Sequence, residues 1–303
     1  MSKKITKKQH YVWRSYLRAW SLNDKIFAYL KNKDEIIYTD LMNLAQQRYF
    51  YKFNKFSKLE KEFLKHTCSE VKGPIRQMLD DLLFDLNLFN ELKEIQEKIT
   101  SNILEPLDEL EKNGYEQLQG IIENQGKKII ACRTLEDLYF LEDDMSKFET
   151  LMFLCFQYFR TKKQKDSQVE NFKNEILDIE NIFSVLVIIN SSKVAQNIFF
   201  DPKIRYILLE IINNEVYFIK GDQPVINLLA EEKDDNGYTK DLAFYYPIAP
   251  KYAIKIEFNN KGNKYQHICI DKEQVLILNN MIISESNEFI FSNSKDYLKK
   301  SCT

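Results

Sequence analysis

The sequence predicts an α+β fold: a helical middle region packed on a mostly antiparallel C-terminal sheet, with a short N-terminal β-hairpin. Three observations predict it. Apolar residues recur at helical spacing through the middle of the chain, alternating runs typical of strands follow residue 201, and two short apolar runs flank a polar turn near residue 32. We expect a single domain over residues 1–303, with a mixed segment at 1–55, a helical region at 56–200 and a strand-rich region at 201–303.

The N-terminal and middle elements follow from local pattern. Residues 25–30 and 35–38 flank a polar turn and predict the hairpin. Apolar residues from 75 to 86 recur at three- and four-residue steps on one helix face, and Pro74 and Pro106 suit first helical turns. Residues 148–159 are apolar nearly all round, which is typical of a buried central helix. Residues 127–132 are interpreted as a short strand.

The C-terminal third predicts strands and one helix. Residues 205–212 and 215–219 flank Asn213-Asn214, a pair that tolerates the positive φ of a tight hairpin. Residues 252–258 and 265–270 predict a second hairpin, followed by a helix at 272–284 and a strand at 288–291. The longest apolar stretch, residues 182–190, is about half the length of a membrane span and indicates a buried helix or strand.

Composition limits the possible functions. Hydrophobic residues make up 44% of the chain and aromatic residues 13%, enough for a sizeable core. The net charge of −2 excludes a generally basic nucleic-acid binder and leaves room only for a local basic patch. Such a patch exists in the first eighteen residues, which hold six basic residues and no acid, although a solvated tail explains it equally well. These residues are Lys3, Lys4, Lys7, Lys8, Arg14 and Arg18.

Several common site types lack their motifs. Only seven glycines are present and neither GxGxxG nor GxxxxGK[ST] occurs, which disfavours dinucleotide and P-loop sites. The five cysteines are scattered without a CxxC motif, and there is no HExxH, so we expect no metal and no cofactor. Unpaired cysteines without a secretory segment or membrane span favour a cytoplasmic protein with no membrane contact.

The candidate site begins at residues 9–20, which hold one of three histidines, both tryptophans and two arginines. Imidazole is the side chain suited to proton transfer near neutral pH, and guanidinium binds phosphate or carboxylate. In the apolar helix at 148–159, Gln157 and the following Arg160 lie three residues apart on one face. A buried arginine needs partners, so this pair marks a second polar point.

Five short patterns follow one another along nearly the whole chain. A His-Tyr-x-Pro-x-x-Tyr-Leu-x-x-Phe pattern fits here with Trp13 and Trp20 in place of Pro and Phe, and Gln-x-x-Arg-Thr-Pro fits with Lys162 in place of Pro. A Ser-Asp-Asn-Pro turn fits residues 221–224, with Gly221 in place of Ser. Pro-x-x-Pro-Lys and Leu-Asn signals also match. The residues that match these patterns are His10, Tyr11, Tyr16, Leu17, Gln157, Arg160, Thr161, Asp222, Pro224, Pro247, Pro250, Lys251, Leu278 and Asn279. In this order, the five patterns resemble the bacterial domain-of-unknown-function family 4238 over nearly the whole chain.

Brought together, these residues would form one polar pocket between the helical and strand-rich regions. His10, Asp222 and Arg160 would be catalytic: His10 as general acid/base, Asp222 to orient the imidazole or act as base, and Arg160 to neutralise an anion. Substrate would be bound by Tyr11, Arg14, Gln157, Gln223, Lys251 and Asn279. The alternative is a buried polar network in which Arg160 pairs with Asp222 for structural reasons alone.

Three classes of function remain open. The first is a phage-defence or toxin-type effector, an RNase-like nuclease or nucleotide-transforming enzyme that uses metal-independent acid/base chemistry on RNA or nucleotides. The second is a non-catalytic module that binds nucleic acid or protein in a defence system. The third is an interaction or antitoxin-like protein, which predicts an exposed apolar patch. The resemblance implies a mobile or defence genetic context and a protein partner encoded nearby.

Overall fold

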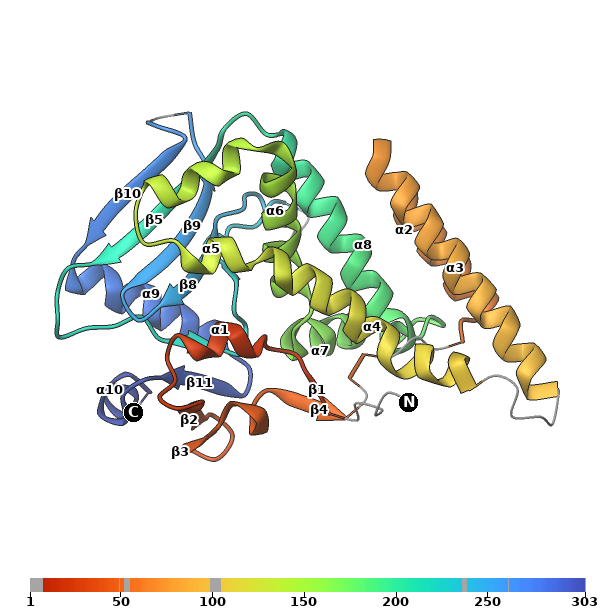
Figure 1. Cartoon of the computed structure of the whole chain (residues 1–303), viewed down its shortest axis with the longest axis horizontal. Coiled ribbons are helices and arrows are strands. Elements are labelled where there is room, and N and C mark those ends of the chain that lie inside the picture. Colours follow the sequence, from red (N-terminus) through yellow and green to blue (C-terminus); the bar gives the residue numbers. More distant parts are fainter. Residues whose placement is uncertain are drawn as a thin grey trace.

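The computed structural model describes residues 8–48, 50–51, 55–98, 105–235, 239–260 and 262–302. Its helical middle region and antiparallel-rich C-terminal sheet confirm the predicted α+β fold class (Figure 1). The predicted basic residues Lys3, Lys4 and Lys7 lie outside the described residues. One hydrophobic core contains residues of the N-terminal, helical and strand-rich regions.

The N-terminal region is built from two small antiparallel pairings. Strand β1 (Lys8–His10) pairs with β4 (Gln46–Arg48), and the predicted hairpin is confirmed as β2 (Lys25–Leu30) and β3 (Glu35–Asp40). Helix α1 (Arg14–Arg18) and the short 3₁₀ helix η1 (Leu41–Asn43) lie between these strands in sequence.

The middle region is helical, as predicted. Helices α6 and α8 pack against each other at its centre, because both carry apolar residues on nearly every face (Figure 1). Helix α2 begins with a capping box between Ser57 and Glu60. The elements are α2 (Lys58–Ser69), α3 (Gly73–Lys98), α4 (Glu105–Gln125), α5 (Lys127–Ala131), η3 (Glu136–Glu142), α6 (Asp144–Phe159), α7 (Lys162–Asn171) and α8 (Ile179–Phe200).

Helix α8 contains the longest apolar stretch of the sequence. Its 22 residues are long and apolar enough to cross a bilayer, and among the described helices it alone meets that test of length and composition. Within the fold, 67% of its most apolar window is buried, which is typical of a core helix as well. Of the two elements expected at residues 182–190, a buried helix or a buried strand, the structure has the helix.

The C-terminal region forms two sheets. The larger has the order β10-β5-β9-β8-β7, and only its β10–β5 pair is parallel. The smaller has the order β3-β2-β11-β6, so it joins the N-terminal hairpin to the C-terminal strands. The elements are β5 (Ile204–Ile211), β6 (Lys220–Gly221), β7 (Ile226–Asn227), β8 (Phe244–Ala249), β9 (Tyr252–Phe258), β10 (Tyr265–Ile270), α9 (Lys272–Glu285), β11 (Phe289–Ser292) and α10 (Lys295–Cys302).

Three local predictions are wrong. Residues 127–131 form helix α5 instead of a strand, because a short apolar pair suits either element. Strand β10 pairs with β5 and not with β9. Residues 215–219 form no ladder with β5, since the side-chain amide of Asn279 and the carbonyl of Pro250 satisfy the backbone there instead.

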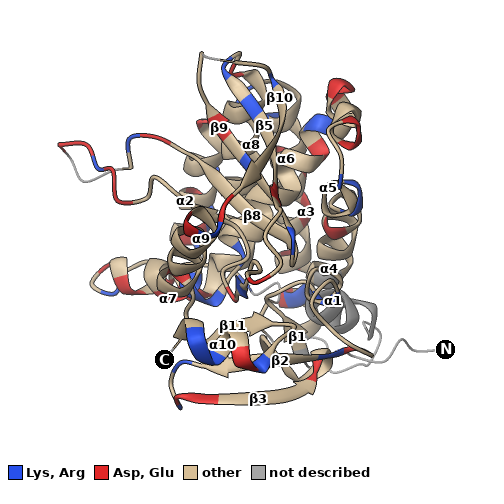
Figure 2. Ribbon diagram, turned by 90° about the vertical axis from the view of Figure 1, so that its left-hand side faces the viewer, with Lys and Arg blue, Asp and Glu red and all other residues tan. Residues whose placement is uncertain are grey.

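Charge is spread over the whole fold. Figure 2 shows acidic and basic residues interspersed on both the helical and the strand-rich elements, in keeping with the net charge of −2.

All five cysteines carry free thiols, and Cys68, Cys132 and Cys155 are buried.

Candidate active site

The N-terminal segment is anchored so that the His10 side chain lines a cleft. The Nδ1 atom of His10 lies 3.1 Å from the carbonyl oxygen of Leu44, and the side-chain oxygen of Gln9 accepts from the backbone N–H of Tyr51 at 2.6 Å. The ring of Trp13 packs edge-on against Phe153 of α6 at 5.4 Å between centroids. These contacts fix the segment on the helical region and orient the imidazole.

Behind this segment lies Arg160, the residue that ends helix α6. It is fully buried, and its guanidinium forms an ion pair with Glu123 of α4 and donates to the carbonyl oxygen of His10 at 2.5 Å. The aromatic rings of Tyr51 and Phe156 lie 5.8 and 5.3 Å from the guanidinium carbon. The hydroxyl of Tyr51 donates to the Arg160 carbonyl. The partner of Arg160 is therefore Glu123, not Asp222.

Glu123 is the carboxylate that faces the cleft. Burial raises its pKa, and the neighbouring Arg160 partly opposes that rise. Gln119, one turn earlier on α4, donates to the His10 carbonyl oxygen at 3.2 Å and to Glu123 at 3.4 Å. The acid is thus held in a fixed position while its side chain keeps 17% of its surface exposed.

The cleft between α1 and α4 has a volume of about 240 Å³ and a mostly polar lining. It brings an imidazole, a carboxylate and two exposed guanidinium groups to one small space. Arg14 also contacts the sulfur of Met42, and Arg18 pairs with Asp24 at 3.0 Å. The residues that line the cleft are His10, Trp13, Arg14, Ser15, Arg18, Gln119 and Glu123.

A second polar cluster lies around Asp222. Its carboxylate accepts the backbone N–H groups of Asn287 and Glu288, each at 2.8 Å. Burial raises the pKa of Asp222 to about 6, against the lowering effect of these hydrogen bonds. The hydroxyl of Tyr11 donates to Glu288 at 2.8 Å, and burial raises the pKa of Tyr11. Asp222 therefore holds the loop that presents Glu288 to Tyr11.

Residues 160–162 connect the two clusters. Arg160 binds the carbonyl of His10, the hydroxyl of Thr161 donates to Gln223, and the ammonium of Lys162 lies 3.5 Å from Glu288. Because these residues follow one another, the family signals near residues 10, 160 and 222 lie side by side. The direct pairing of Arg160 with Asp222, which the structural alternative required, is absent from the ion pairs of the described residues, where Arg160 pairs with Glu123.

The remaining predicted binding residues lie outside the cleft lining. Gln223 donates to the carbonyls of Tyr158 and Val225, at 3.0 and 2.8 Å. Asn279 binds Ile219 N–H and Tyr217 C=O.

Lys251 and Gln157 complete this group. Lys251 donates to the Asn213 carbonyl, and its ammonium lies 5.1 Å from the Tyr217 ring. Gln157 is fully buried, and neither atom of its amide has a hydrogen-bond partner among the described residues. A part in substrate binding stays a prediction for these residues.

Lys220, which directly precedes the turn at residues 221–224, is a fully buried lysine that sequence reasoning missed. Its ammonium nitrogen lies 3.5 Å from the centroid of the Tyr16 ring and 3.7 Å from that of Trp20, and it donates to the Tyr16 carbonyl. Burial lowers its pKa well below the ordinary value. A lysine directly after the apolar run at 216–219 was the available signal.

Glu123 and Gln119 were also missed. Their four-residue spacing places them on one helix face, but nothing in the sequence of α4 distinguishes that face from a solvated one. Among the described residues, no group of three or more histidine, cysteine, aspartate or glutamate side chains could hold a metal ion.

Comparison with known proteins gives a family. The family model described as "Protein of unknown function (DUF4238)" matches residues 8–296 of the 303-residue chain. The chain belongs to the DUF4238 family. The match confirms the resemblance drawn from the five sequence patterns. Searches of curated proteins and of solved structures found no match.

Proposed function

We propose that this DUF4238 protein is a toxin- or defence-type ribonuclease that cleaves RNA by acid/base chemistry in the cleft at His10. The observation that carries the proposal is the convergence of His10, Glu123, Arg14 and Arg18 on one polar cleft. An imidazole and a carboxylate of raised pKa are a suitable pair for two proton transfers near neutral pH.

The reaction needs only groups that line the cleft and the RNA itself. Glu123 takes the proton of a ribose 2′-hydroxyl while that oxygen attacks the adjacent phosphorus. His10, as imidazolium, gives a proton to the departing 5′-oxygen. The bond from phosphorus to the 5′-oxygen breaks, and the products are a 2′,3′-cyclic phosphate and a 5′-hydroxyl. Arg14 and Arg18 stabilise the charge on the phosphate.

Buried Arg160 acts through Glu123 and is a positioning residue. Its ion pair fixes the carboxylate, and its bond to the His10 carbonyl fixes the main chain that carries the imidazole. Both catalytic groups therefore depend on one guanidinium, which explains how a helix end in the core can serve a surface cleft.

The test is cleavage of a labelled RNA with and without a metal chelator, with analysis of the product ends. We expect cyclic phosphate ends, no dependence on metal, and a loss of about 10²–10⁴-fold in rate for His10→Ala and for Glu123→Gln. Lys33→Ala, an exposed change in the β2–β3 turn, is the control. The rates are compared at a temperature below the melting temperature of each variant, so that a loss of rate does not come from unfolding.

A binding module is the second candidate. It is favoured by the position of Asp222, whose carboxylate binds backbone N–H groups instead of the imidazole. Under this alternative the wild type binds RNA without cleaving it, and Arg14→Ala with Arg18→Ala reduces affinity and the salt dependence of binding. Intact RNA after long incubation with folded protein would reject the ribonuclease proposal.

A further inference from the structure

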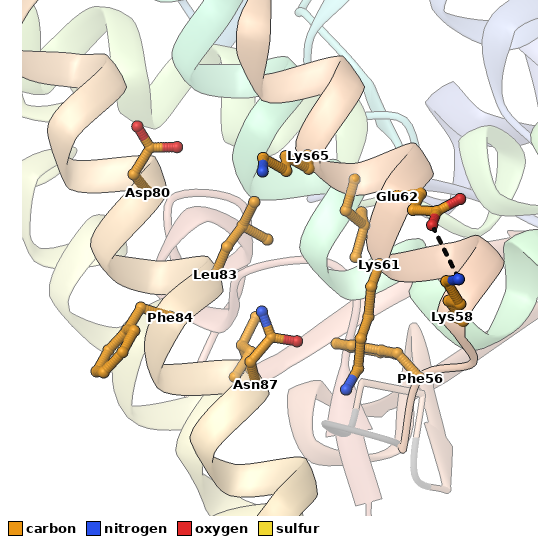
Figure 3. Close-up of a pocket in the computed structure, with 11 residues that line it drawn as sticks. Phe56, Lys58, Lys61, Glu62, Lys65, Asp80, Leu83, Phe84 and Asn87 are labelled. Atoms are coloured by element: carbon orange, nitrogen blue, oxygen red, sulfur yellow. Dashed lines mark ion pairs between the residues drawn. The ribbon is translucent and has the colours of Figure 1, made fainter.

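Helices α2 and α3 form the edge of the molecule farthest from the strand-rich region (Figure 1). A groove of about 340 Å³ lies between them (Figure 3). Its floor is apolar, formed in part by buried Leu64 and Leu86. The α2 wall carries Lys61 and Lys65, and Figure 3 shows Lys65 reaching from α2 towards α3.

Beside the groove, α3 exposes an apolar stripe. Phe84, Leu88 and Ile95 are 68%, 45% and 47% exposed. At about 100° per residue these three fall within about 40° of one another on the helix. Their spacing of four and seven residues is that of a helix seam that packs on another helix. Phe84 also lines the rim of the groove, and Figure 3 shows its ring pointing away from α2.

The two flanks of this stripe carry opposite charge. On one side lies the groove, with the lysines of α2 beyond Leu83 and Asn87. The groove lining also holds Glu62, which pairs with Lys58, and Asp80, which pairs with Arg76, so Lys61 and Lys65 give this flank its net positive charge. On the other side lie exposed Asp81 and Asp85, which the same helical geometry places about 60° and 100° round from Phe84. A complementary surface would thus be an apolar helix seam with acids on one flank and lysines on the other.

The α3 surface of a second copy has that composition, and we propose that the protein forms a two-fold dimer through it. The two α3 helices lie parallel, with the two-fold axis along them. This rotation reverses the flanks, so Lys61 and Lys65 of each copy face Asp81 and Asp85 of the other. An antiparallel two-fold pairing would keep each flank on its own side and set lysines against lysines. The apolar stripes meet in the middle.

Charge reversal tests the dimer directly. The first variant carries Lys61→Glu and Lys65→Glu, and the second carries Asp81→Lys and Asp85→Lys. Each variant alone repeats a like-charge clash twice about the axis and is expected to be a monomer by sedimentation equilibrium. Mixed in equal amounts, the two variants have opposite charges at both contacts, and we expect a heterodimer.

Controls separate association from folding. Circular dichroism melts check that each variant is folded, and Ile176→Asp, at a residue 94% exposed on a different part of the chain, should leave the wild-type dimer intact. A wild-type protein that stays monomeric up to its solubility limit overturns the proposal and leaves the surface to another acidic partner. Variants that dimerise alone, or a mixture that stays monomeric, also overturn it. RNA cleavage by the monomeric variants keeps this test separate from that of the proposed function.

Discussion

Replacement of Lys220 by methionine should change how the stability of the protein depends on pH. Lys220 is fully buried between the rings of Tyr16 and Trp20 and donates to a backbone carbonyl. Among the ion pairs of the described residues, none contains this ammonium group, and burial lowers its pKa. The folded protein therefore holds Lys220 as a neutral amine over a range of pH in which the unfolded chain holds it as a cation.

The size of the effect follows from proton linkage. An unfolded lysine loses its proton near pH 10.4, about its ordinary pKa. Between the lowered pKa of the folded state and about pH 10.4, the unfolded chain binds one more proton than the folded protein. The free energy of unfolding then rises with pH by about 1.4 kcal/mol per pH unit, and this stability is lost as pH falls towards the folded pKa. Below the folded pKa the contribution is constant.

The assay is chemical denaturation of wild type and Lys220→Met at a series of pH values from neutral to alkaline. The unfolding free energy of wild type minus that of Lys220→Met should rise with pH by about 1.4 kcal/mol per pH unit. At the lowest pH of the series Lys220→Met should be the more stable protein, because a methionine fills the same space without a charge. Lys33→Met, in the exposed β2–β3 turn, is the matched control. Parallel pH curves for wild type and Lys220→Met would show that the buried amine stays protonated, and would refute the reasoning.

Three further predictions concern the clusters around Arg160 and Asp222. Glu123→Ala leaves buried Arg160 without its counter-charge and should cost about 3–5 kcal/mol in denaturant melts, whereas the double change Glu123→Leu with Arg160→Met should cost less. Gly221→Ala should cost about 1–3 kcal/mol in the same melts, because an added Cβ would lie 1.9 Å from the Ser286 hydroxyl oxygen. For Asp222, a folded pKa of about 6 lies above the unfolded value, so wild-type stability should fall as pH rises from about 4 to 6, and Asp222→Asn should remove that fall. Equal slopes for wild type and Asp222→Asn would contradict the last expectation.

The fold class could be predicted because its signals are local. Apolar residues around nearly the whole circumference of 148–159 specify a central helix, and the alternating runs after residue 201 specify strands. Pairing could not be predicted in the same way. Strand β10 pairs with the edge of β5 that faces away from β9, and nothing in the sequence between β9 and β10 specifies that choice.

The candidate site was predictable only in part, for a related reason. His10 and Arg14 line the cleft, and the histidine, tryptophans and arginines of that segment were visible in the sequence. Glu123 could not be predicted as a site residue, because a glutamate on a helix is usually solvated. Only the fold shows that a buried arginine lies against it. Asp222 was expected beside the imidazole, but its carboxylate fits the N–H groups of a loop that sequence pattern does not locate.

The arrangement of residues 160–162 explains why separate sequence signals of the family belong together without forming one catalytic set. Arg160 fixes the His10 main chain from the core side, and Lys162 reaches Glu288, which Tyr11 also binds. Residues 160–162 thus hold both residues of this segment, His10 by its carbonyl oxygen and Tyr11 by its hydroxyl through Glu288. A shift of that arm would move the imidazole and the loop at Asp222 together. Under the proposed ribonuclease function, motif residues that never touch the RNA still set the geometry of the cleft, and their substitution should act on turnover through position rather than through proton transfer.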